Sequence, residues 1–183
     1  MSIPTRPLTV SVNGTTHGPL DVPLGMTMID VLHEMLGLTG SRLGCGVGIC
    51  RACVVIWDKD DHTSAEMQSC ITDAHFFDGK RIRTIEGIAQ CNAKGEIVAP
   101  SLVQQAFLDH FSFQCGYCTP GFVNAATVLI ERLKRVPVPR AELEATITAA
   151  LENHICRCTG YVRYYQAVRD VILATPGLTR ESA

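Results

Sequence analysis

The chain has 183 residues, of which 46% are hydrophobic and 19% are charged, and its formal net charge is −2. This length fits one large domain or two small ones, and the apolar fraction can supply a core for each half. The near-neutral charge excludes the basic surface typical of nucleic-acid binding or of attachment to anionic lipid. No apolar run approaches the roughly 18 residues of a membrane-spanning helix, so we expect no direct membrane insertion.

The chain opens with a predicted β-hairpin. Leu8, Val10 and Val12 alternate with polar residues and are followed by Asn13-Gly14. Both turn residues tolerate the positive φ of a type I′ turn, so we expect a tight turn and a return strand near residues 17–22.

A helix and further strands complete the predicted N-terminal half. Thr27 is a candidate N-cap, and the apolar positions that follow predict a helix over residues 28–36. A glycine-punctuated loop over residues 40–52 leads to a short buried strand at residues 54–57, and another strand is predicted at residues 81–85. This order predicts a small mixed sheet packed on one helix.

The pattern becomes helical after about residue 90. Start signals and apolar periodicity predict four helices, near residues 101–110, 120–133, 141–152 and 162–173. They form two pairs, and a cysteine motif interrupts each pair. The last ten residues have the composition of a loose tail.

Eight of the nine cysteines form two quartets. The odd total and the spacing favour thiolates held by metal in a reducing compartment over disulfides. The first quartet has the spacing C-x4-C-x2-C with a more distant fourth member, which is typical of a plant-type [2Fe–2S] cluster. Its predicted metal ligands are Cys45, Cys50, Cys53 and Cys70. A zinc knot or a group of buried thiols is the alternative.

The second quartet lies in the helical half. Each of its two cysteine pairs comes just before a predicted helix, where the helix dipole and free N–H groups stabilise thiolates. Two such loops facing each other would form a four-thiolate cage, and the combination Cys-x2-Cys with Cys-x-Cys is uncommon for zinc. The predicted metal ligands are Cys115, Cys118, Cys156 and Cys158.

The sequence around these cysteines is specific. The two loops read Gln114-Cys115-Gly116-Tyr117-Cys118-Thr119-Pro120-Gly121 and Cys156-Arg157-Cys158-Thr159-Gly160-Tyr161. They resemble the small iron–sulfur subunit of the molybdenum hydroxylases, the xanthine dehydrogenase and aldehyde oxidoreductase family, over roughly residues 8–173. The resemblance implies an α+β chain: a β-grasp plant-type ferredoxin domain at residues 1–88 and an all-α four-helix [2Fe–2S]-binding domain at residues 89–183.

The resemblance also implies a function. Electrons would leave a molybdopterin centre of the cytosine dinucleotide type in a large partner subunit and pass through the two clusters. Haem c in a cytochrome c subunit, or FAD in an FAD subunit, would accept them. Gln114 and Cys158 match positions that lie against the pterin, and this chain itself would bind no substrate and carry no catalytic residue.

The overall reaction implied is the oxidation of an aldehyde to a carboxylic acid. The alternatives are the small subunit of an N-heterocycle or purine hydroxylase, a stand-alone two-cluster electron carrier, and a zinc-stabilised structural protein. Because residues 1–6 lack an export signal, we expect cytoplasmic assembly. Co-export with a partner would allow residence in the periplasm or at a membrane.

The chain departs from the family pattern around the first quartet. Gly46-Val47 replaces an acidic start, and this Gly-Cys-Gly form resembles the branch that reduces cytochrome c. Arg51 replaces a glycine, and its positive charge would raise the potential of a cluster beside it. A contact with an acidic partner surface and simple solvent exposure are the alternatives for Arg51.

For the remaining cysteine, histidine and tyrosine candidates we expect structural rather than redox roles. We expect Cys91 to be a buried structural thiol and His154 to be a surface histidine. Tyr117 and Tyr161 are expected to shield the second cluster.

Overall fold

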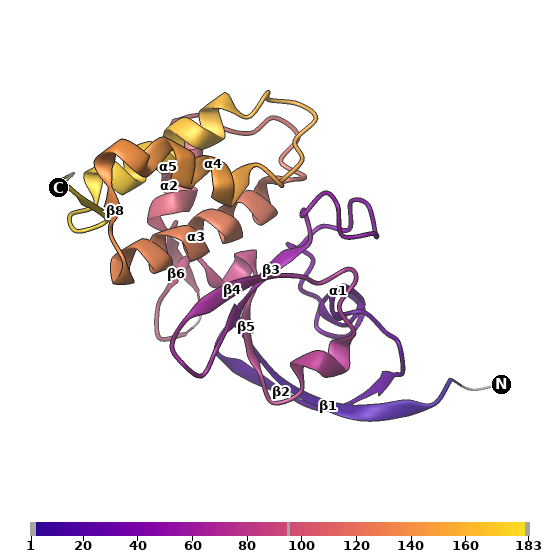
Figure 1. Cartoon of the computed structure of the whole chain (residues 1–183). Helices are drawn as coiled ribbons and strands as arrows, with labels where there is room; N and C mark the ends of the chain where they lie inside the picture. The colour runs from indigo at the N-terminus through magenta and orange to yellow at the C-terminus, as the bar shows by residue number, and fades with distance from the viewer. Residues whose placement is uncertain (1–2, 95, 182–183) are drawn as a thin grey trace.

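The computed structural model describes residues 3–94 and 96–181. These residues form a sheet-containing N-terminal half and a helical C-terminal half that lie side by side (Figure 1). The five strands of the sheet follow the order β2-β1-β5-β3-β4. They are β1 (Thr5–Val12), β2 (Thr15–Pro23), β3 (Val54–Asp58), β4 (Ser64–Gln68) and β5 (Arg81–Arg83).

The predicted hairpin is confirmed. β1 and β2 pair antiparallel, with Val12 opposite Thr15. The turn between them has φ of 53° at Asn13 and 82° at Gly14, the two positive values that a type I′ turn requires. β1 then pairs parallel to β5, while β3 runs antiparallel to both β4 and β5. A central parallel pair with flanking antiparallel strands and a packed helix is the β-grasp arrangement, so the predicted fold of this half is confirmed.

The predicted helix over residues 28–36 is only partly α-helical. α1 covers Met28–Asp30, and the chain continues as the π-helical turn η1 (Val31–Met35). In this wider turn the N–H of Leu36 donates to the carbonyl of Val31, five residues earlier. A 3-10 turn, η2 (Ala74–Phe77), packs nearby. Their apolar side chains fill one core with the sheet, including Leu8, Val10, Met28, Leu32, Phe77 and Ile82.

The four predicted helices are present. They are α2 (Leu102–Asp109), α3 (Thr119–Arg135), α4 (Leu143–Leu151) and α5 (Val162–Ala174). Ser101 begins α2 with a full capping box to Gln104, and α4 is preceded by the 3-10 turn η4 (Arg140–Glu142). The short turn η3 (Ile85–Gly87) and the ribbon β6 (Gln90–Cys91) with β7 (Ile97–Ala99) connect the two halves.

The helical half has its own core. Phe122 of α3 stacks on Tyr164 of α5, with ring centroids 4.2 Å apart and planes 7° apart. Phe107 of α2 meets the Tyr164 ring edge-on at 5.1 Å. These aromatic contacts hold the N-terminal ends of α3 and α5 together, because all three rings are almost fully buried.

The prediction of a loose C-terminal tail is wrong for residues 174–181. Leu178 is only 1% exposed, and β9 (Thr179–Arg180) pairs parallel with β8 (Val138–Pro139). The apolar side chain of Leu178 belongs to the helical core, and burying it ties down the residues that follow. Residues 182–183 of the predicted tail lie outside the described residues.

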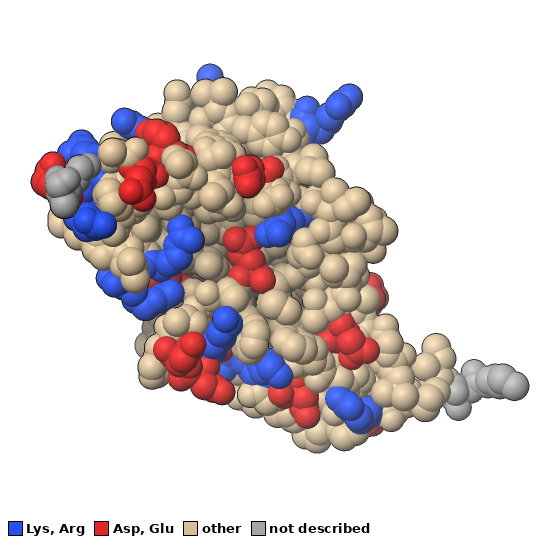
Figure 2. All heavy atoms as spheres, viewed as in Figure 1, with Lys and Arg blue, Asp and Glu red and all other residues tan. Residues whose placement is uncertain are grey.

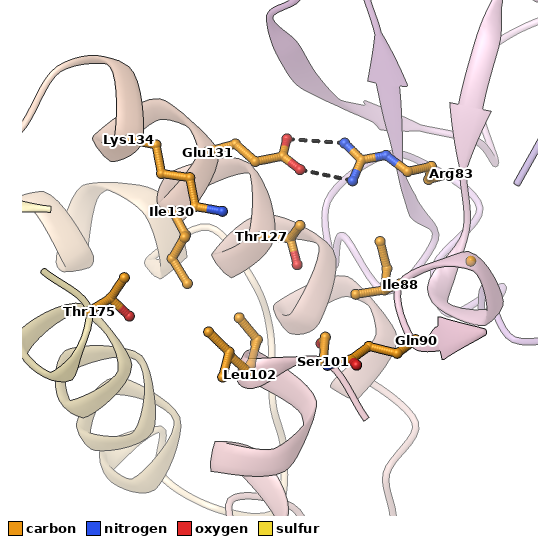
Figure 3. Close-up of a pocket in the computed structure, with 12 residues that line it drawn as sticks. Arg83, Ile88, Gln90, Ser101, Leu102, Thr127, Ile130, Glu131, Lys134 and Thr175 are labelled. Atoms are coloured by element: carbon orange, nitrogen blue, oxygen red, sulfur yellow. Dashed lines mark hydrogen bonds and ion pairs between the residues drawn. The ribbon is translucent and has the colours of Figure 1, made fainter. Parts of the chain in front are cut away.

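Helix α3 joins the two halves. It lies against β3 and β4, and the buried Asn124 side chain donates to the carbonyl of Val54 at 2.7 Å. Arg83 of β5 pairs with Asp58 at 2.6 Å and with Glu131 of α3 at 2.8 Å. Figure 3 shows the Arg83–Glu131 pair beside a pocket whose lining includes no cysteine of either quartet. None of the helices in the described part of the chain has the length and apolar character needed to cross a membrane.

Candidate iron–sulfur sites

The first cysteine quartet gathers at one end of the sheet. Cys53 comes directly before β3, and Cys70 comes two residues after the end of β4. Because Val54 lies opposite Gln68 in the antiparallel register, the two cysteines emerge side by side. Ser69 strengthens this end of the strand pair by donating from its hydroxyl to the Cys53 carbonyl at 2.7 Å. The other two members, Cys45 and Cys50, come from the loop before β3.

Backbone N–H groups in this loop point at sulfur. Those of Ile49 and Cys50 donate to the Cys45 Sγ at 3.3 and 3.4 Å. Backbone hydrogen bonds, the one from Cys50 foremost, lower the pKa of Cys45 to about 6. This site therefore favours a negatively charged sulfur before any metal is bound.

The glycines in this loop serve two different needs. Gly46 and Gly48 have φ of 66° and 76°, which turns the chain back around the sulfur. Gly44 is required for space instead, since a Cβ there would lie 2.8 Å from the Cys50 Sγ. Among these three glycines, positive φ is thus found at Gly46 and Gly48 and not at Gly44.

The second quartet lies between the helices. Cys118 is the N-cap of α3, and Cys115 precedes it in the same loop. Cys156 and Cys158 lie in the loop that leads into α5. The Sγ atoms of Cys115 and Cys158 are 3.6 Å apart, so helix packing brings together thiols that are distant in the sequence.

Side-chain hydroxyls surround the inner sulfurs of this quartet. The Thr159 hydroxyl lies 3.1 Å from the Cys156 Sγ, and the Tyr164 hydroxyl lies 3.6 Å from the Cys118 Sγ. Burial opposes ionisation of Cys156, but hydrogen bonds from Thr159 and from the backbone outweigh it and lower its pKa. Burial raises the pKa of Cys118 to about 12. A metal at this site would have to displace the Cys118 proton.

The thiols associate in pairs in both quartets. The Cys115 and Cys158 thiols are in contact, and among the thiols Cys50 acts on the pKa of Cys45, Cys70 on that of Cys53 and Cys156 on that of Cys118. Within residues 3–94 and 96–181, no three His, Cys, Asp or Glu side chains converge on one point that could hold a single metal ion. Tetrahedral zinc needs four ligands around one ion, whereas a [2Fe–2S] cluster takes two protein ligands on each of two irons. Two pairs of thiols in each quartet match the two irons of a [2Fe–2S] cluster.

The two cysteine loops are in direct contact. The N–H of Ile155 donates to the carbonyl of Cys50 at 3.1 Å, and the Tyr117 hydroxyl donates to the carbonyl of Leu43 at 2.8 Å. Gly121, in the first turn of α3, allows the closest approach, since a Cβ there would lie 2.3 Å from the Arg51 carbonyl oxygen. The ends of the two halves that carry cysteines thus meet backbone to backbone.

Comparisons with known proteins place this arrangement in a family. Residues 11–94 match the family described as 2Fe-2S iron-sulfur cluster binding domain, and residues 84–169 match the [2Fe-2S] binding domain family. The nicotinate dehydrogenase small FeS subunit of Eubacterium barkeri is 36% identical over 90% of this chain and 94% of its own length. The chain belongs to the small iron–sulfur subunits of the molybdenum hydroxylases.

Solved structures of the family share the fold. Quinoline 2-oxidoreductase from Pseudomonas putida 86 matches with a TM-score of 0.76 and 29% identity, covering 96% of this chain and 94% of that one. Aldehyde oxidoreductase from Desulfovibrio desulfuricans ATCC 27774 matches with a TM-score of 0.74 and 30% identity. That match covers 97% of this chain but 19% of the other, so the family fold also occurs as one segment of a longer chain.

Two predictions for single residues are wrong, those for Cys91 and His154. Cys91 is exposed, because the β6–β7 ribbon lies outside both cores. His154 is 1% exposed, since its ring packs on Phe122 at 5.1 Å. Arg51 has an ion-pair partner in the same chain, since its guanidinium lies 3.2 Å from the Glu66 carboxylate, and its side chain keeps 31% exposure. The charge expected to raise the potential of the first site therefore has a counter-ion.

The two tyrosines bind backbone groups as well as bordering the second site. Tyr117 is half exposed and ties its loop to Leu43. The hydroxyl of Tyr161 accepts a hydrogen bond from the Cys156 N–H at 3.2 Å. Sequence reasoning also missed Asn124 and Glu66, because neither lies near a cysteine in the sequence. Gly121, directly after Pro120 in the second motif, was a sequence signal for the close contact between α3 and the first cysteine loop.

Proposed function

We propose that this chain is the electron-transfer subunit of a multi-subunit molybdenum hydroxylase, with the eight cysteines of the two quartets as cluster ligands. When bound, the two [2Fe–2S] clusters supply one-electron steps. The observation that carries the proposal is the contact between the two cysteine loops, where the Ile155 N–H donates to the Cys50 carbonyl. We assign the ferredoxin-type domain to residues 1–88 and the helical domain to residues 89–183.

The second site is proposed to face a large subunit with a molybdopterin centre of the cytosine dinucleotide type. Gln114, Cys115 and Cys158 are all exposed, which leaves them available to a cofactor held by another chain. The match to aldehyde oxidoreductase, which occupies 19% of that chain, supports a large partner. We propose Gln114 and Cys158 as the residues nearest the pterin.

The first site is proposed to face the acceptor, haem c in a cytochrome c subunit or FAD in an FAD subunit. Cys45 is exposed among aliphatic side chains that are each about half exposed or more, namely Leu43, Val47, Ile49 and Ile71. Figure 2 shows Lys, Arg, Asp and Glu interspersed over one face and sparse on the side where this loop lies in Figure 1. An apolar surface of this kind favours a subunit that stays bound over a diffusing carrier recruited by charge.

Two overall reactions are candidates. The first is oxidation of an aldehyde to a carboxylic acid, in which water supplies the oxygen and two electrons and two protons are released. The second is hydroxylation of an N-heteroaromatic ring, which the names of the nicotinate and quinoline relatives favour. In either case the partner binds the substrate, and we propose that the complex assembles in the cytoplasm.

The test is to isolate the native complex through this chain. We expect about four irons per copy of the chain and two distinct [2Fe–2S] signals in low-temperature electron paramagnetic resonance (EPR). Flavin or haem bands in the visible spectrum identify the acceptor. Reduction of the clusters by an aldehyde or by an N-heteroaromatic compound separates the two reactions. A species of about 20 kDa that carries iron without partners, or a colourless zinc protein, would contradict the proposal.

A further inference from the structure

One carboxylate links the two cysteine loops. Glu66 lies in β4 opposite Ile56, and its side chain is 19% exposed. Its Oε2 atom lies 3.2 Å from the Arg51 Nη1 and 3.2 Å from the His154 Nε2. Arg51 stands between two cysteines of the first quartet, and His154 stands two residues before Cys156. A single side chain on the sheet thus binds both loops.

Arg51, the first of the two residues that Glu66 binds, has a backbone conformation that does not favour arginine. Its φ is 59°, in the left-handed region where glycine is preferred. Non-glycine residues persist there only where the surrounding structure fixes them. Three contacts fix Arg51: its guanidinium binds Glu66, and its carbonyl accepts from the Val54 N–H at 3.2 Å and packs against Gly121 of α3.

His154, the second residue that Glu66 binds, is buried, and its imidazole has few hydrogen-bond partners. The imidazole is 1% exposed and packs on Phe122. Its Nδ1 has no hydrogen-bond partner in the part of the chain that the structure describes. Because an ionised carboxylate only accepts hydrogen bonds, Nε2 donates to Glu66. Glu66 is therefore the polar group that orients this ring, directly before Ile155 and its bond to the Cys50 carbonyl.

We propose that Glu66 is a positioning residue for electron transfer between the two sites. By binding Arg51 and His154 together, it holds the Cys50 carbonyl and the Ile155 N–H in contact and fixes the separation of the two quartets. This inference rests on the proposed function, because it assigns a role to the contact through which the two redox sites meet.

Charge and position can be separated by substitution. Glu66→Gln keeps an oxygen that accepts from Arg51 or His154 but removes the negative charge, so Arg51 loses its counter-ion. We expect the potential of the first site to rise while the geometry is retained. Glu66→Ala removes both links, so the loops separate and the magnetic coupling between the two reduced clusters changes.

A second carboxylate provides a matched control. Glu131 also joins the two halves, since it binds Arg83 of β5 and the Ser64 hydroxyl of the same strand β4. It contacts neither cysteine loop among the hydrogen bonds of the described residues. Glu131→Ala should therefore weaken the docking of the halves without changing the coupling at the cysteine loops.

The experiment compares the native complex carrying each variant by EPR-monitored redox titration and iron analysis. We expect four irons per chain in every variant. In Glu66→Ala, the EPR splitting that magnetic coupling between the two reduced clusters produces should be lost. In Glu66→Gln, this splitting should remain and the reduction potential of the first site should rise. If Glu66→Ala keeps the splitting, or if Glu131→Ala loses it equally, the inference is overturned.

Arg51→Gly covers the case in which Glu66→Ala fails to bind iron. Glycine suits the positive φ at this position, so the loop can still form. We expect a smaller splitting, because the ion pair between residue 51 and Glu66 is lost. An unchanged splitting in Arg51→Gly would overturn the inference. Fewer than four irons or a single signal in the unmodified complex would instead be a failure of the proposed function.

Discussion

The two cysteine sites are built by different means. In the first site, strand register and a glycine-rich loop place the thiols, and backbone N–H groups point at the Cys45 sulfur. In the second, the packing of α3 on α5 brings the cysteine pairs together, and hydroxyls of Thr159 and Tyr164 contact the sulfurs. The first site therefore depends on local chain conformation, and the second depends on a distant helix–helix contact.

The largest expected effect comes from breaking the helix contact. Phe122→Ala removes a fully buried ring that stacks on Tyr164, and such a truncation costs about 3–5 kcal/mol. We expect the second cluster to be lost and the first to remain, so iron falls by about half. Phe77→Ala, at an equally buried ring in the first core, should show the opposite selectivity in EPR spectra. Equal loss of both signals in either variant would show that the two sites are not independent.

A substitution in the first loop should have a smaller and equally selective effect. A methyl group in Gly44→Ala would lie 2.8 Å from the Cys50 Sγ, so the sulfur must move and the first cluster should bind less iron. Gly116→Ala is the counterpart in the second loop, where φ is 77° but no atom lies within 4 Å. We expect a cost of only about 1–2 kcal/mol there, visible in thermal unfolding without loss of iron. Iron loss in the Gly116 variant greater than in the Gly44 variant would refute this ranking.

The connection between the halves gives the next prediction. Burial opposes ionisation of Glu131, but hydrogen bonds from Arg83 and Ser64 outweigh it and lower its pKa. Because the pKa of Glu131 is lower in the folded state, its ionised form stabilises the fold at pH values above the usual glutamate pKa of about 4.3. This stabilisation is lost as the pH falls through the folded-state pKa.

Glu131→Gln should therefore reduce the free energy of unfolding at neutral pH by about 1–3 kcal/mol. This is less than for a fully buried pair, because the Glu131 side chain keeps 26% exposure. Urea titrations of the metal-free chain at several pH values measure the effect. The difference between variant and native chain should shrink in acid, and a difference that grows would contradict the assigned sign.

The smallest effect compares two exposed thiols directly. Backbone hydrogen bonds lower the pKa of Cys45 to about 6, whereas the neighbouring Cys115 thiol raises the pKa of Cys158. At pH 7 the metal-free chain should carry about ten times more thiolate than thiol at Cys45. Alkylation with iodoacetamide followed by peptide mass analysis should label Cys45 before Cys158. The reverse order would show that the backbone donors do not act on Cys45.

Features with a local signal could be predicted from the sequence. The Asn13-Gly14 turn and the four helices depend on residues close in the chain, and the structure has them. The π-helical turn after α1, strand β4 and the β8–β9 pair were not predicted, because tertiary packing decides them. The same reason applies to Glu66 and to the buried His154, which meet only after the halves are docked.

The absence of a side chain at Gly121 has a consequence for electron transfer between the two cysteine loops. Helix α3 and the first loop touch there with no room for a methyl group. Any larger residue would push the two cysteine loops apart, and the probability of electron tunnelling declines steeply with distance. Under the proposed function, a few ångströms of backbone spacing in this chain would therefore change the rate at which electrons leave the partner subunit.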